Sequence, residues 1–248
     1  MLGTTGSSEI KITLQEFCTG RYSPPPVQTS PFPSPAPLDA RDERVFEAVR
    51  ELLAVQGMRL SMDAVATLAG CSKQTLYSRY GCKRELLRQA MRLHVSNATS
   101  GLSSCDRKPL RQTLIDFAIG YLDHRNKPKV LQTSQLLGAS AHEFRDEARF
   151  MYHGSAEALR DQVAEWMQTE IARGRLTHDD PHFMAELLLS MIAGQDFERQ
   201  RFHAPHRDDA QQRQRWADFA IDAFLRAFAN APEAGMAPEN KNNPRSFS

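Results

Sequence analysis

The sequence predicts an all-α protein built from two helical domains. Apolar residues recur three and four positions apart over most of residues 40–230, which is the period of a helix with one buried face. The alternating β-branched and aromatic runs of strands, and the Asn-Gly or Asp-Gly turns of hairpins, are absent from the sequence. The chain has 248 residues, of which 41% are hydrophobic. This content suffices for one large domain or two modest ones, each with its own core.

The same composition excludes several classes of protein. No run approaches ~18 consecutive apolar residues, so we expect no transmembrane helix and no membrane partner. The N-terminus lacks a basic head followed by an apolar core, so we expect no secretory signal and a cytoplasmic protein. The cysteines are too few for a disulfide scaffold and form no Cys-x-x-Cys zinc pair. They are Cys18, Cys71, Cys82 and Cys105.

The two ends of the chain differ from its middle. Seven of the fourteen prolines lie between Pro24 and Pro37. Proline fixes φ and removes a backbone donor, so residues 1–39 are predicted to be a disordered, extended arm. A ligand for a proline-recognising domain is an alternative role for this arm. Residues 231–248, polar and again rich in proline, are predicted to be a disordered tail.

The first predicted helix spans about residues 39–56. Val45, Val49 and Leu53 share one face of it, and Gly57 follows as a residue that ends helices. Two short helices come next, over residues 62–69 and 73–80, with Ser61 and Ser72 as their N-caps. A glycine-containing turn of a few residues joins them, which is the helix-turn-helix arrangement. A longer helix is expected from about residue 82.

The rest of the chain is predicted to form longer helices. We expect them over residues 109–124, 129–151 (as two helices broken near Gly138), 155–172, 180–200 and 209–228. No fixed repeat period links these segments, so a solenoid is not indicated.

The helix over residues 73–80 carries the chemistry of this region. Leu76 faces inward, while the other faces offer cations, amides and hydroxyls that suit base edges in a major groove about 12 Å wide. We expect five residues to read bases: Lys73, Gln74, Thr75, Ser78 and Arg79. Hydroxyls and a cation around the helix suit phosphate oxygens, which fix the register of the protein on DNA. The candidate phosphate ligands are Ser61, Ser72, Tyr77, Tyr80 and Lys83.

Residues 42–93 resemble the DNA-binding domain of TetR-family transcriptional repressors. The match runs through Ser61-Met62-Asp63-Ala64-Val65-Ala66, Ala69-Gly70, Ser72-Lys73-Gln74-Thr75-Leu76-Tyr77 and Lys83-Arg84-Glu85-Leu86-Leu87. About fifty residues agree in register without a gap. Three positions depart mildly from the family: Cys71 replaces a small apolar residue, Tyr80 replaces the commoner phenylalanine, and Cys82 replaces a small or polar residue.

The resemblance implies an N-terminal three-helix helix-turn-helix domain over residues 40–94 and an effector-binding and dimerisation domain over residues 95–230. Gly174-Arg175-Leu176, Asp179-Asp180-Pro181 and Ala193-Gly194 are similar to one branch of these regulatory domains. The resemblance further implies that the protein binds a palindromic double-stranded DNA operator as a homodimer. An unidentified small-molecule effector would release the protein from this operator. The protein would be a non-enzymatic repressor without a cofactor.

Two sets of apolar residues are candidates for roles in the second domain. A pocket for the effector would draw on Leu114, Phe117, Tyr121, Leu136, Met151 and Trp166. A dimer face on the last two long helices would draw on Leu188, Met191, Phe219 and Phe224. Ordinary core packing is the alternative role for each of these side chains.

Other functions have weaker support in the sequence. The protein could be an activator, or a small-molecule-binding protein with a degenerate DNA-binding domain. Cys82 follows a glycine near a helix start, beside Lys83 and Arg84, so redox sensing is a further alternative. Metal sensing would need the pairs His178 with His182 or His203 with His206, whose helix start and loop contexts disfavour it. No Ser/His/Asp or Cys/His constellation and no glycine-rich phosphate loop supports catalysis.

The charge of the chain is divided between its parts. The formal net charge of +1 argues against a nucleic-acid partner when taken globally. However, residues 41–94 carry ten Lys+Arg and six Asp+Glu, a net charge of +4, whereas residues 95–248 carry a net charge of −2. The sequence therefore predicts a basic DNA-binding domain on a mildly acidic second domain.

Overall fold

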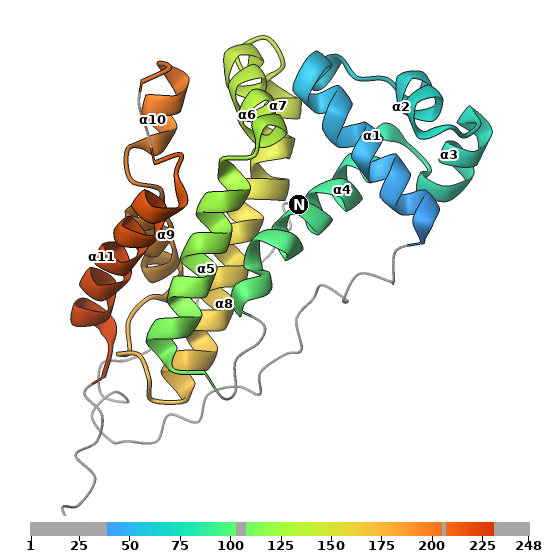
Figure 1. The fold of residues 1–248 in the computed structure, drawn as a ribbon. Coiled ribbons are helices and arrows are strands. Elements are labelled where there is room, and N and C mark those ends of the chain that lie inside the picture. The colour runs from blue at the N-terminus through green and yellow to red at the C-terminus, as the bar shows by residue number, and fades with distance from the viewer. Residues whose placement is uncertain (1–38, 103–107, 205–206, 231–248) are drawn as a thin grey trace, which may run out of the picture. The chain divides into compact units, whose positions relative to one another are not determined.

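Helices make up most of the residues that the computed structural model describes, which are 39–102, 108–204 and 207–230 (Figure 1). Within these ranges there is no strand, only an isolated antiparallel bridge between Leu176 and Ala229. The all-α prediction is therefore confirmed. None of the described helices is both long enough and apolar enough to cross a membrane. The arm over residues 1–38 and the tail over residues 231–248 lie outside the described residues.

The N-terminal part contains the predicted helix-turn-helix. Its helices are α1 (Ala40–Gln56), α2 (Met62–Ala69) and α3 (Lys73–Tyr80). Asp39 caps α1 by accepting hydrogen bonds from the backbone of Arg41 and Asp42. Gly70 ends α2 at φ +66°, a left-handed conformation that favours glycine, and the chain turns directly into α3.

One long helix, α4 (Lys83–Thr99), belongs to both hydrophobic cores of the molecule. The N-terminal core consists of the buried apolar residues between Val45 and Met91, joined by Met151. The C-terminal core consists of those between Val95 and Phe224, Met151 excepted. Helix α4 therefore links the packing of the two cores.

The remaining helices pack around these cores. They are α5 (Leu110–Arg125), α6 (Pro128–Ser140), α7 (Arg145–Tyr152), α8 (Ala158–Ala172), α9 (Pro181–Ala193), α10 (Asp196–Arg201) and α11 (Ala210–Phe228). The break between α6 and α7 lies at residues 141–144, after the expected position at Gly138. A π-helical turn (His153–Glu157) joins α7 to α8, so the expected start of a helix at residue 155 is also displaced.

The predicted single helix over residues 180–200 is wrong, because Gly194 separates α9 from α10. Gly194 adopts φ +53° beside the side chains of Arg207 and Trp216. The indole of Trp216 donates to the Ile192 carbonyl at 2.8 Å, and Arg207 donates to the Ala193 carbonyl at 3.3 Å. These side chains satisfy carbonyls that the interrupted helix leaves without a helical partner.

Helices α6 and α7 pack against the N-terminal part of the chain. Lys129 on α6 donates to Glu47 at 2.5 Å and to Glu51 at 2.8 Å, both on α1. The Leu136 side chain lies so close to Gly57 that a Cβ there would meet it at 3.0 Å. Met151 on α7 completes the N-terminal core. Met151 thus belongs to the N-terminal core and Leu136 packs near Gly57, whereas three of the other predicted pocket residues belong to the C-terminal core.

Candidate nucleic-acid interface

Helix α3 is anchored through its N-cap and through one buried leucine. The Ser72 side chain accepts a hydrogen bond from the Thr75 backbone at 3.0 Å, and Leu76 is fully buried in the N-terminal core. The opposite faces of this two-turn helix are left to solvent. Lys73, Gln74 and Ser78 are exposed, and Thr75 is half-buried with its hydroxyl 2.8 Å from that of Ser72.

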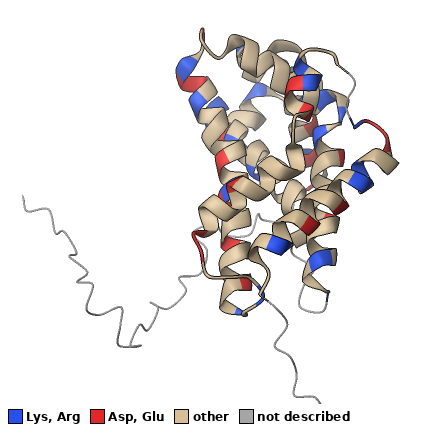
Figure 2. Cartoon of the chain, turned by 90° about the vertical axis from the view of Figure 1, so that its left-hand side faces the viewer, with Lys and Arg blue, Asp and Glu red and all other residues tan. Residues whose placement is uncertain are grey.

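Two cations of α3, Lys73 and Arg79, are paired with acidic side chains. Figure 2 shows Lys and Arg interleaved with Asp and Glu along the helices. Lys73 lies 2.8 Å from a carboxylate oxygen of Asp63 on α2, and this hydrogen bond raises the pKa of the lysine. Both side chains are exposed, so the pair is weak and water or a phosphate can replace the carboxylate.

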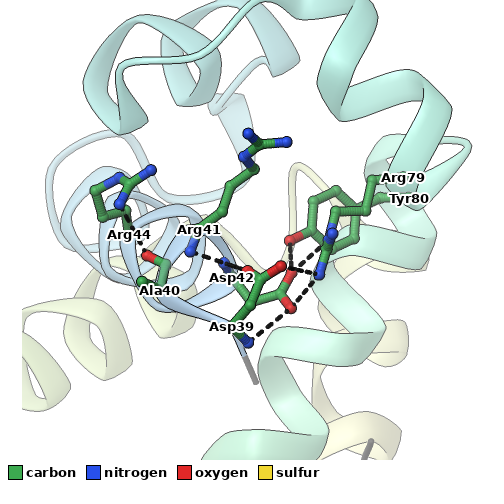
Figure 3. Close-up of polar contacts among 7 residues, drawn as sticks. All are labelled: Asp39, Ala40, Arg41, Asp42, Arg44, Arg79 and Tyr80. Atoms are coloured by element: carbon green, nitrogen blue, oxygen red, sulfur yellow. Dashed lines mark hydrogen bonds and ion pairs between the residues drawn. The ribbon is translucent and has the colours of Figure 1, made fainter. Parts of the chain in front are cut away.

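Arg79, a predicted base reader, lies against the start of α1 (Figure 3). Its Nε donates to Asp42 at 2.6 Å, and its Nη2 donates to Asp39 at 2.9 Å. The guanidinium is 39% exposed and the Asp42 carboxylate 9%. Hydrogen bonds from Arg79 first, and then from Tyr80 and the Asp39 backbone, hold the pKa of Asp42 below its ordinary value despite its burial.

Tyr80, a predicted phosphate ligand, is part of the N-terminal core. Only 3% of it is exposed, and its hydroxyl donates to Asp42 at 2.5 Å. Burial and this hydrogen bond to a carboxylate raise its pKa. A buried hydroxyl that is already bonded cannot reach a phosphate on the surface, so Tyr80 leaves the set of phosphate ligands.

The other predicted phosphate ligands remain near the surface. Ser61 caps α2 by accepting from the Ala64 backbone at 3.2 Å, and Tyr77 is exposed. Lys83 is half-buried and donates to the Met58 carbonyl at 2.8 Å, which ties the start of α4 to the turn after α1. Desolvation lowers the pKa of Lys83.

Four predicted pocket residues come together in the second domain. Leu114, Phe117 and Tyr121 belong to the C-terminal core, and Trp166 packs against it. The rings of Phe117 and Tyr121 stack with centroids 6.0 Å apart. All four therefore line or pack against the C-terminal core, to which both α5 and α8 contribute.

The predicted dimer residues do not share one surface. Leu188 and Phe224 are at most 1% exposed in the C-terminal core, and Met191 is half-buried against it. Only Phe219, on α11, is exposed, at 62%. The sequence reasoning missed Phe183 and Leu187, which are exposed on α9 at 72% and 44%. Their spacing of four residues was the available signal, because it places both on one face of a helix.

The alternative chemistries gain no support from the described residues. Within 39–102, 108–204 and 207–230, no three His, Cys, Asp or Glu side chains are grouped to hold a metal ion. His206, of the second histidine pair, lies outside the described residues. Cys82 is exposed at the start of α4 and Cys71 is half-buried, both as free thiols.

Asp42 is the residue of this region that the sequence reasoning missed. It receives hydrogen bonds from two residues of α3, although it lies at the start of α1. The available signal was local: Asp39 and Asp42 form a capping box at the start of α1, which places Asp42 in the first turn.

Comparison with known families identifies both halves of the chain. The model for bacterial regulatory proteins of the tetR family matches residues 45–90. The model for the C-terminal domain of AefR-like transcriptional repressors matches residues 112–230. Among curated proteins, a search finds no match.

Solved structures of TetR-family regulators have the same fold. One from Mesorhizobium loti is 23% identical with a TM-score of 0.61, over 77% of this chain and 97% of the other. One from Agrobacterium tumefaciens is 22% identical with a TM-score of 0.60, over 77% and 96%. The flavonoid-responsive regulator FrrA is 25% identical with a TM-score of 0.55, over 76% and 97%. The helix-turn-helix and the two matched domains show that this chain belongs to the TetR family of DNA-binding transcriptional regulators.

Proposed function

We propose that this protein is a dimeric repressor that binds a pseudo-palindromic operator through α3 and releases it when a small molecule binds. The observation that carries the proposal is the exposed polar face of α3, held in place by the capped Ser72 and the buried Leu76. A helix of two turns reads only a few base pairs, so two symmetric copies are needed for useful specificity.

The base-reading set follows from the exposure of each side chain and from the partners that it already has. Gln74 is suited to pair with adenine, Lys73 with guanine, and the Thr75 methyl with thymine, while the Ser78 hydroxyl suits several bases. Ser61, Ser72, Tyr77 and Lys83 surround this face and suit phosphate oxygens. Arg79 and Tyr80 are left out because both donate to Asp42.

Selection of genomic fragments by the purified protein tests the proposal. We expect bound fragments to share a pseudo-palindrome, and Gln74→Ala to relax the preference at one base pair per half-site. The loss should be about 5- to 150-fold, because a bidentate amide contact contributes about 1–3 kcal/mol of discrimination.

A glutamine distant from α3 provides the matched control. Gln112 is exposed on α5 and donates to Asp116 at 2.7 Å, so Gln112→Ala should leave affinity and preference unchanged. An unaltered base preference in a folded Gln74→Ala variant would remove Gln74 from the base-reading set.

The effector is proposed to be a planar, largely apolar molecule that enters the C-terminal core. Support comes from the aromatic side chains of Phe117, Tyr121 and Trp166, and from the flavonoid response of the related regulator FrrA. Because α4 joins both cores, an effector that favours one packing of the C-terminal core would shift the populations of α3 orientations. Release of the selected operator fragments by flavonoids and simpler phenols provides a direct screen.

A further inference from the structure

Two carboxylates at the start of α1 and two side chains at the end of α3 form one compact cluster (Figure 3). Asp42 accepts from Arg79 Nε at 2.6 Å, from Arg79 Nη2 at 2.5 Å and from the Tyr80 hydroxyl at 2.5 Å. Asp39 accepts from Arg79 Nη2 at 2.9 Å and from the backbone of Arg41 and Asp42. We call these four side chains the α1–α3 clasp: Asp39, Asp42, Arg79 and Tyr80.

The clasp holds the end of α3 that is opposite its N-cap. Ser72 and Leu76 fix the first turn of α3, whereas Arg79 and Tyr80 are its last two helical residues. Asp42 is itself fixed, because it sits in the first turn of α1 within the capping box of Asp39. The ring of Tyr80 also packs against Phe46 of α1, with centroids 5.9 Å apart. Both ends of the short helix are thus fastened to rigid neighbours.

We propose that Asp42 is the positioning residue of the recognition helix, and that Arg79 acts on DNA specificity through Asp42 rather than by touching a base. This inference rests on the proposed DNA-binding function of α3. Base edges are read only when side chains are held within about 0.5 Å of the productive geometry. Phosphate attraction tolerates a far looser arrangement, because it is electrostatic and independent of sequence.

The negative charge of Asp42 allows its positioning role to be distinguished from a purely electrostatic effect on DNA binding. Asp42→Asn removes a negative charge from the DNA-binding domain, so electrostatics alone predicts tighter binding to every duplex. Loss of the clasp instead predicts weaker binding to the operator, with non-specific binding little changed. Tyr80→Phe provides a second variant that removes only the hydroxyl and keeps the ring packed on Phe46.

The experiment measures affinity for the selected operator and for a scrambled duplex at one salt concentration. We expect Asp42→Asn and Tyr80→Phe each to lose about tenfold or more in operator affinity, since each breaks a hydrogen bond to a charged group. The scrambled duplex should change by less than about threefold in either variant. Arg44→Gln is the control: Arg44 is exposed, donates to the Ala40 carbonyl within α1 and is not part of the clasp, so the loss of its positive charge should weaken binding to both duplexes alike.

A double-mutant cycle then assigns the role of Arg79. If Arg79 acts through Asp42, Arg79→Gln and the Asp42→Asn/Arg79→Gln double variant should lose about the same operator affinity, with the base preference lowered across all the positions that α3 reads rather than at a single one. A loss of preference confined to one base pair per half-site in Arg79→Gln would overturn the proposal, because it would show that Arg79 contacts that base. Tighter binding of Asp42→Asn to both duplexes would overturn it as well.

Hydrogen exchange distinguishes failure of the clasp from failure of the proposed function. If the wild-type protein selects no sequence, the DNA-binding proposal fails. The positioning role of the clasp can then still be tested through the hydrogen exchange of the backbone amides of α3. These amides should lose protection against exchange in Tyr80→Phe and Asp42→Asn, while the amides of α5 keep theirs. Unchanged α3 exchange in a folded Tyr80→Phe variant would overturn the positioning role in either case.

Discussion

At the scale of single residues, two glycines with different surroundings predict opposite effects of the same substitution. A Cβ on Gly101 would lie 3.0 Å from the Phe117 Cα and 3.1 Å from its backbone nitrogen. A Cβ on Gly120, an exposed residue inside α5, would meet no described heavy atom within 4 Å apart from its chain neighbours and the backbone of its own helix. Gly101→Ala should lower the free energy of unfolding by about 1–3 kcal/mol, because backbone must move. Gly120→Ala should raise it by about 0.5–1 kcal/mol through helix propensity.

Urea unfolding of the two variants beside wild type measures both effects, with Gly120→Ala as the control for the substitution itself. Equal effects of the two substitutions would show that the chain before α5 does not rest on the Phe117 backbone.

The burial of single residues on α3 was predictable from sequence, but their polar partners were not. The periodicity correctly placed Leu76 inside and Gln74 outside. Arg79 and Tyr80 have polar groups that suit DNA equally well, yet both donate to Asp42, 37 and 38 residues earlier. Local spacing carries no information on such a distant partner, and tertiary packing decides it.

At the scale of elements, a histidine pair joins α4 to α5 and predicts a pH dependence of stability. His94 and His124 form a hydrogen bond of 3.1 Å between ring nitrogens, with ring centroids 4.4 Å apart. Burial, followed by the neighbouring histidine and the cations Lys127, Arg125 and Arg50, lowers the pKa of His124 to about 4. Burial, with the same three cations, also lowers the pKa of His94.

Both histidines bind protons more weakly when folded, so their stabilisation is present above pH 6.5 and is lost as the pH falls toward 4. Between pH 7 and pH 5 the free energy of unfolding should fall by about 2 kcal/mol on account of His124. Urea titrations across this range measure the slope, and His94→Gln/His124→Gln should flatten it. His142→Gln, at an exposed histidine before α7, is the control and should keep the wild-type slope. A double variant as steep as wild type would place the pH dependence elsewhere.

The start of a helix was predictable from the sequence where its capping residue is local. A break inside a helix was not predictable where distant side chains stabilise it. Asp180 and Pro181 mark the start of α9, and Asp209 caps α11, as their residue types indicate. The break at Gly194 depends instead on Arg207 and Trp216, which supply hydrogen bonds to the interrupted helix. Many helices tolerate a glycine in their interior, so the sequence alone could not show that the helix ends at Gly194.

At the scale of the whole molecule, the basic excess of the DNA-binding domain is partly neutralised by acidic side chains of the same domain. Residues 41–94 have a net charge of +4, yet Arg79 is paired with Asp42, and Lys73 with Asp63. The basic excess therefore steers the domain toward DNA without placing every cation on a base. In the proposed function, specificity then depends on Lys73 and the neutral side chains of α3, and on how firmly α1 holds that helix.

The last two long helices predict the assembly of the whole molecule. Phe183 and Leu187 on α9 and Phe219 on α11 are large, exposed and apolar, and burying them in a second copy would remove this surface from water. Wild type should therefore be a dimer by light scattering at micromolar concentration without DNA. Phe183→Glu and Phe219→Glu should be monomeric with unchanged helicity, because a charge would be buried in the interface. Phe202→Glu is the control: this phenylalanine is 72% exposed just after α10, and its variant should stay dimeric. A wild-type monomer, or a dimer that survives both substitutions, would rule out this interface. In the case of the monomer, the protein would bind DNA with a single recognition helix.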